Sequence, residues 1–204
     1  MPHDTPVFRR AFLIASCGAM AGTALVPARA WALSTAQASG LVDQVTAEIT
    51  RIINSGQSEA TMLRDFERML SRYADMPTIA QSVLGPPARA ASASQLRAFA
   101  DAFKGYMARK YGRRFREFIG GTVHVTGAQD TGRFVEVVGV VDMPTTAPFE
   151  VRFRVWDRSG QALFIDLLIE GVSLVITERS EMGSLLERNG GSIDATTAAL
   201  GSLG

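Results

Sequence analysis

Few side chains in this sequence have the types and spacing that catalysis requires. Beyond residue 32 the chain keeps one histidine, His124, and no cysteine, so we expect neither a histidine-based triad nor a histidine-containing metal cluster. His124 falls in a predicted strand, where a solvent-facing histidine is a simpler interpretation than a general base. Neither a dinucleotide-binding glycine motif after a strand nor a P-loop sequence occurs, so nucleotide hydrolysis is not expected.

Two aspartates remain as candidates for the paired carboxylates of general acid–base chemistry, Asp142 and Asp166. Asp142 precedes a Met-Pro pair and is interpreted as a strand-end residue. Asp166 lies between Ile165 and Leu167, which would desolvate its carboxylate if the side chain faces inward. The alternative is a carboxylate at the sheet surface that pairs with a neighbouring arginine or a backbone N–H group.

The composition limits the class of protein. Lysine and arginine number 21 against 20 acidic residues, a formal net charge of +1, so the chain lacks the basic footprint of a nucleic-acid-binding protein. Hydrophobic residues make up 47% of the 204 residues, which is enough to bury a core and excludes a disordered or collagen-like chain. The length fits one domain, with or without an export segment.

Residues 1–32 have the order of a secretory signal peptide. Arginines at 9–10 precede an uncharged run over residues 11–26, and small residues lead to a cleavage site after Ala32. The run is shorter than the 18 or so apolar residues expected of a membrane-spanning helix. The arginine pair also resembles a twin-arginine signal, so Sec and twin-arginine export both stay open. A lipoprotein box ending at Cys17 is disfavoured because the apolar stretch before it is too short, and we expect residues 33–204 to form a single mature domain.

Apolar residues at helical spacing predict four helices in the first part of the mature chain. Ser58 is a candidate N-cap for the second helix, Gly85 and the two prolines after it end the third, and Ser92 or Ser94 caps the fourth. The fourth helix is long and rich in aromatic residues, and a Gly-Gly pair ends it. The predicted helices cover residues 41–53, 58–73, 75–84 and 92–118.

After residue 121 the apolar spacing changes from helical to alternating, which predicts a sheet. Residues 149–155 alternate most regularly, so this strand is expected to have one dry face and one wet face. Helices followed by consecutive antiparallel strands make an α+β fold, with N-terminal helices packed on a twisted, four-stranded, mainly antiparallel sheet. The predicted strands lie at 123–125, 134–141, 149–156 and 162–169, and C-terminal helices follow at 174–186 and 194–203.

The apolar residues are concentrated on the aromatic fourth helix and on the predicted strands at 135–141 and 163–169. Core packing is the interpretation that the residues alone favour. A curved sheet that faces a helix with large side chains can instead enclose a cavity, which the same residues would line.

The segment from Asp166 to Leu174, Asp-Leu-Leu-Ile-Glu-Gly-Val-Ser-Leu, continues to Arg179-Ser180-Glu181 and resembles the MlaC, or toluene-tolerance auxiliary, family. The matching order extends upstream through Val83-Leu84-Gly85 and covers essentially the whole mature chain. The sequence departs from the family at Ala162 and at Pro86-Pro87-Ala88, where the family commonly has tryptophan. These departures leave the shape of the pocket mouth and the choice of lipid open.

The resemblance implies a periplasmic lipid carrier with no enzymatic activity and no cofactor. A deep apolar pocket between helices and sheet would sequester phospholipid acyl chains and leave the headgroup near solvent. The implied partners are an inner-membrane ABC transporter complex with an MCE-domain protein and an outer-membrane lipoprotein complex, in a lipid transport system that maintains the outer membrane. Burying a chain of ~16 methylenes removes about 13 kcal/mol of apolar hydration at ~0.8 kcal/mol each, as an upper bound.

The resemblance and the inward alternation of the strands together indicate seven lipid-binding residues. Val172 is the most specific, because it lies in the segment that carries the resemblance and directly follows Gly171. Gly171 itself is expected to permit a sharp turn from strand to helix. The seven residues are Phe103, Met107, Val137, Val151, Phe153, Ile165 and Val172.

Three alternatives stay open. The cargo could be another lipid, such as a hopanoid. The chain could be a cone-shaped α+β enzyme that acts on a steroid-like or polyketide substrate with Asp166 as its base. It could also be a periplasmic adaptor, which would have a filled core and no small ligand.

Overall fold

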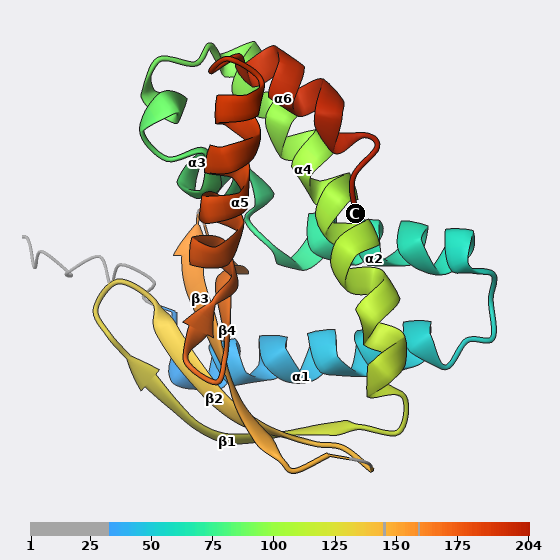
Figure 1. The fold of residues 1–204 in the computed structure, drawn as a ribbon. Helices are drawn as coiled ribbons and strands as arrows, with labels where there is room; N and C mark the ends of the chain where they lie inside the picture. Colours follow the sequence, from blue (N-terminus) through green and yellow to red (C-terminus); the bar gives the residue numbers. More distant parts are fainter. Residues whose placement is uncertain (1–32, 145, 159) are drawn as a thin grey trace, which may run out of the picture. The chain divides into compact units, whose positions relative to one another are not determined.

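A computed structural model describes residues 33–144, 146–158 and 160–204, and the predicted signal peptide lies outside the described residues. In this part of the chain, six α-helices flank one sheet of five strands (Figure 1). The helices are α1 (Thr35–Ile53), α2 (Glu59–Tyr73), α3 (Met76–Leu84), α4 (Ala93–Arg114), α5 (Leu174–Arg188) and α6 (Ile193–Leu200), with short 3-10 turns η1 (Pro86–Arg89) and η2 (Phe115–Phe118). The strands are β1 (Thr122–Asp130), β2 (Val135–Asp142), β3 (Phe149–Arg158), β4 (Gln161–Ile169) and β5 (Val172–Ser173).

Polar caps set the starts of α2 and α4 where the sequence predicted them, whereas α1 begins earlier than the predicted residue 41, at Thr35, because Ser34 caps it. Ser58 is the N-cap of α2, and its hydroxyl accepts from the backbone N–H of Thr61. At α4 the cap is Ser92, because its hydroxyl accepts from Gln95 N and the Gln95 side chain accepts from Ser92 N. Gly85 ends α3 with a φ of 66°, which glycine adopts without strain.

The sheet is antiparallel throughout, with the order β1-β2-β3-β4-β5. The α+β prediction is confirmed, and the short strand β5 is an addition to the four predicted strands. Glu170 and Gly171 both have positive φ, at 48° and 80°, and reverse the chain so that Val172 pairs with Ile169. The chain therefore makes a tight hairpin before α5 begins, where a direct turn from strand to helix was expected.

One face of the sheet is covered by α1, which contacts all four long strands (Figure 1). On β2 every second residue from Val135 to Val141 is buried, as expected for a strand with one face toward helices. Most buried apolar residues form two clusters, one of α1, α2 and the sheet together with Ala108 of α4, and one of α3, α4, α5 and α6. Small domains usually have one contiguous core, so this division directs attention to the space between the clusters.

Candidate functional site

A cavity of about 620 Å³ is bordered by residues of both core clusters. Its wall is formed by α1 to α5, η2 and all five strands, and most of the lining side chains are apolar. Phe66 and Met69 of the first cluster line it, as do Val83 and Phe103 of the second. A space of this size and polarity fits an elongated apolar ligand.

Five of the seven residues predicted to bind lipid line this cavity. Phe103 and Met107 come from α4, Val151 and Phe153 from β3, and Val172 from β5. Phe153 lies 5.7 Å, ring to ring, from the lining residue Phe164 on β4.

The other two predicted residues, Val137 and Ile165, do not line the cavity. Val137 has 0% exposure and packs in the cluster formed by α1, α2 and the sheet. Ile165 lies in a β-bulge, because Arg154 pairs with Asp166 while Val155 pairs with Phe164 and leaves Ile165 without a partner in the register. Leu167 and Ile169 line the cavity opposite Phe153 and Val151, and the bulge puts Phe164 in the place expected for Ile165.

Several lining residues from the first three helices were not predicted. They belong to apolar helix faces that the periodicity identified, but their spacing does not show whether a face meets a core or a cavity. These residues include Val45, Ile49 and Ile53 on α1, Phe66, Met69, Leu70 and Tyr73 on α2, and Ile79 and Val83 on α3.

The mouth of the cavity is marked by the lining residues that are exposed to solvent. These are Thr50, Arg114, Glu117 and Val172, and the Val172 side chain is among the few large apolar groups exposed in the described residues, at 61%. Nearby, Phe118 and Phe149 meet edge to face at 6.2 Å and also line the cavity. The exposed part of the lining thus combines apolar side chains with one cation and one anion.

Asp166 borders the cavity, but its carboxylate is fully used by neighbouring donors. Oδ1 accepts from the backbone N–H groups of Leu167 at 2.9 Å and Val175 at 3.2 Å. Oδ2 accepts from the Ser173 hydroxyl at 2.7 Å and from Arg154 at 3.3 Å. Of the two alternatives that the sequence left open for Asp166, the structure has the carboxylate paired with an arginine. Asp142 does not pair with Asp166; its carboxylate lies 3.6 Å from Nε2 of His124 on β1.

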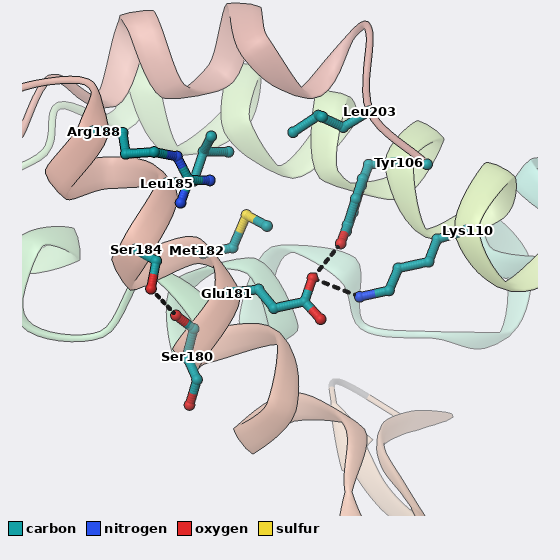
Figure 2. A pocket seen from close by; sticks show the side chains of 10 residues that line it. Tyr106, Lys110, Ser180, Glu181, Met182, Ser184, Leu185, Arg188 and Leu203 are labelled. Carbon is teal, nitrogen blue, oxygen red and sulfur yellow. Dashed lines mark hydrogen bonds and ion pairs between the residues drawn. The ribbon is translucent and has the colours of Figure 1, made fainter.

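A polar network bridges α4 and α5 beside the cavity. The Glu178 Oε1 atom accepts from Lys110 Nζ at 2.7 Å and from the Tyr111 hydroxyl at 2.5 Å. Lys110 also donates to Glu181 at 2.7 Å, and Tyr106 donates to the same carboxylate at 2.9 Å (Figure 2). Burial, followed by the hydrogen bond to Glu178, raises the pKa of the Tyr111 hydroxyl above its ordinary value.

The network separates the apolar cavity from a second, more open pocket of about 580 Å³. Figure 2 shows this second pocket, with Tyr106, Lys110 and Leu203 toward one side, Leu185 and Arg188 toward the other, and Glu181 between them. Tyr111 and Glu178 line the apolar cavity, whereas Lys110 and Glu181 line the second pocket. We take the apolar cavity as the candidate site, because it is the larger and more enclosed of the two and holds most of the predicted residues.

Comparison with known proteins gives two findings. A family model described as MlaC protein matches residues 43–202 of the chain. The solved structure of the phospholipid-binding protein from Ralstonia solanacearum, in complex with a phospholipid, has the same fold with a TM-score of 0.66 at 20% sequence identity. That match covers 81% of this chain and 93% of the Ralstonia chain.

The described helices include none with the length and hydropathy needed to span a membrane. MlaC proteins are non-enzymatic lipid carriers, which confirms the expectation that the chain is not an enzyme. Because the family model matches most of the chain, from residue 43 to residue 202, this protein belongs to the MlaC family.

Proposed function

We propose that the protein is a periplasmic carrier that holds the acyl chains of a phospholipid in the apolar cavity. The observation that carries the proposal is the cavity of about 620 Å³ between the two core clusters, with a mostly apolar lining. Removing acyl methylenes from water stabilises the complex by about 0.8 kcal/mol each, so no catalytic group is needed to retain the cargo. The Ralstonia protein of the same fold was solved with a phospholipid, which supports this class of cargo.

The proposed pathway follows from the family and from the predicted signal peptide. The carrier would exchange lipid with an inner-membrane MCE-domain ABC transporter complex and with an outer-membrane lipoprotein complex. Exchange requires a partner that offers the acyl chains an equally dry path, because a chain that crossed water would regain the full cost of hydration. The apolar Val172 side chain at the mouth suits such a contact.

The test is to purify the mature chain from a Gram-negative periplasm without detergent and to compare its native and denatured masses. Material extracted from the protein is then identified by mass spectrometry. We expect one or more phospholipids at stoichiometric amounts. A hopanoid or another bound lipid would keep the carrier mechanism and change the cargo, whereas a ligand-free protein that also takes no lipid from vesicles would contradict the proposal.

A further inference from the structure

Gly112 is a buried glycine in the wall of the apolar cavity. It belongs to α4, which packs against α2, and it lines the cavity together with Phe66 of α2. Its backbone is helical and its φ is not positive, so neither a turn nor a helix end requires glycine at this position. Glycine also weakens a helix relative to alanine. The position therefore calls for glycine only if a side chain would not fit there.

The space around Gly112 has no room for a side chain. A Cβ atom at this position would lie 2.8 Å from Cδ2 of Leu63 and 3.1 Å from Cδ2 of Phe66. Carbon atoms in favourable contact are about 3.5–4.0 Å apart, so both neighbours would have to move. Both neighbours come from α2, and Gly112 thus lets their side chains lie directly against the backbone of α4.

The two neighbours differ in the space that is open to them. Leu63 is only partly buried and is not among the residues that line the cavity, so the end of its side chain can turn toward solvent. Phe66 is 1% exposed, belongs to the first core cluster and lines the cavity. Because core side chains are close-packed, the free space beside the Phe66 ring is the cavity itself. A methyl group at position 112 would therefore push this ring into the cavity.

We propose that Gly112 is a specificity-determining residue, which keeps the Phe66 ring out of the cavity and so reserves room for both acyl chains of a diacyl phospholipid. The inference rests on the proposed function. Its effect is one of size, because a lipid that fills the cavity needs the space beside Phe66. A lysophospholipid with the same headgroup has a single acyl chain and needs less of that space.

The experiment is a competition between these two lipids. Protein freed of lipid is incubated with vesicles of palmitoyl-oleoyl phosphatidylglycerol that contain palmitoyl lysophosphatidylglycerol as a minor component, and the bound lipids are counted by mass spectrometry. In Gly112→Ala we expect the ratio of bound diacyl lipid to bound lysolipid to fall about tenfold from the wild-type value, because overpacking opposes the larger lipid. A general loss of stability would lower both lipids together and leave the ratio unchanged.

Each result of this competition decides one question. An unchanged ratio in Gly112→Ala would overturn the role of Gly112 and leave the carrier function intact. A wild-type protein that takes up neither lipid would overturn the proposed function. The control is Gly183→Ala, because Gly183 lies in open space on α5 and is not among the lining residues. This variant gains the same helix propensity and should keep the wild-type ratio.

Second substitutions at the two neighbours test the route through Phe66. In a Phe66→Leu background the ring is absent, so adding Gly112→Ala should change the ratio little. In a Leu63→Ala background the contact with Phe66 remains, so adding Gly112→Ala should still lower the ratio. The reverse pattern, in which Leu63→Ala abolishes the effect and Phe66→Leu does not, would overturn the assignment to the Phe66 ring.

The Leu63→Ala background also keeps the test valid if Gly112→Ala alone does not fold, because it removes the shortest contact of the new methyl group. The ratio in the double variant must then fall below that of Leu63→Ala. Circular dichroism and thermal unfolding confirm that each variant compared is folded.

Discussion

The hydroxyl of Ser173 donates a 2.7 Å hydrogen bond to Asp166 and so ties the first residue before α5 to strand β4. The same hydroxyl accepts from the backbone N–H of Ile176 at 3.1 Å, as the N-cap of α5. Asp166 also accepts from Val175 N. One carboxylate therefore fixes the strand, the hairpin and the start of α5 along the edge of the cavity.

Replacing Asp166 tests this structural role against a catalytic one. In Asp166→Asn, one acceptor becomes an NH₂ group that cannot accept from Ser173 or Arg154. We expect the free energy of unfolding in urea to fall by about 1–3 kcal/mol, because buried donors lose their acceptor. Lipid uptake per folded molecule should not change, since no oxygen of Asp166 is left to act on a ligand.

Asp142→Asn is the control for that variant. Asp142 is half exposed and lies 3.6 Å from His124, so the change should cost less than about 0.5 kcal/mol. If Asp166→Asn kept its stability but lost lipid, Asp166 would have to be a ligand contact, and the structural interpretation would be wrong.

Two valines on neighbouring strands allow the cavity and the packed core to be tested separately. Val151 lines the cavity, whereas Val137 is fully buried outside it. In Val151→Phe the larger ring can enter the cavity, so we expect lipid uptake to fall with a change in stability of less than about 1 kcal/mol. In Val137→Phe the ring overfills the packed core, and we expect a loss of about 1–3 kcal/mol with uptake per folded molecule unchanged.

Urea unfolding and lipid mass spectrometry on the same samples measure both effects. The opposite pattern, with lipid lost in Val137→Phe and stability lost in Val151→Phe, would mean that the lipid occupies a different part of the fold.

The sequence predicts the elements of this fold better than it predicts the cavity wall. Helix caps such as Ser58 act locally. Strand β3 pairs regularly with β2, so its alternation puts Val151 and Phe153 on the face that lines the cavity. On β4, residues 162–165 and 167–169 are all apolar, so any register can bury them. The bulge at Ile165 depends on pairing with β3, which a single sequence does not reveal.

The polar network was also beyond prediction from the sequence. Lys110 and Tyr111 meet Glu178 from 68 and 67 residues away, and a glutamate on a predicted helix is usually solvated. Its burial follows from the packing of α5 beside α4. The only indication in the sequence was the segment that resembles the MlaC family. That segment includes Glu181, but it does not show which residue Glu181 pairs with.

The network predicts how stability depends on pH. Burial alone would raise the pKa of the Glu181 carboxyl, but hydrogen bonds from Lys110 and Tyr106 hold it below its ordinary value of 4.5. A carboxyl whose pKa is lowered by folding stabilises the fold above its unfolded pKa and loses this contribution as pH falls through the folded pKa. We therefore expect the wild type to have a higher melting temperature than Glu181→Gln near pH 7. The two melting temperatures should converge as the pH falls below about 4.5.

Lys110, in the same network, predicts how stability changes at alkaline pH. Burial alone would lower the pKa of its ammonium group, but hydrogen bonds to Glu178 and Glu181 raise it above 10.5. Its contribution is fully present below the unfolded pKa and is lost as pH rises through the raised folded value. Lys110→Met should therefore remain less stable than the wild type at neutral pH and approach it above about pH 10.5, and a constant difference across that range would contradict the ion-pair interpretation.

The hairpin between β4 and β5 holds the only non-glycine residue with positive φ in the described part of the chain, Glu170. A two-residue turn with positive φ at both positions favours Asn-Gly, so Glu170→Asn should raise the free energy of unfolding by a few tenths to about 1 kcal/mol. Gly171→Ala should lower it by about 1 kcal/mol or more, although open space surrounds Gly171, because a Cβ atom strains the backbone at φ 80°. Gly183→Ala, in open space within α5, is the matched control and should stabilise the helix. A loss of stability in Glu170→Asn would show that the Glu170 side chain, rather than its backbone, holds the turn that places Val172 at the mouth.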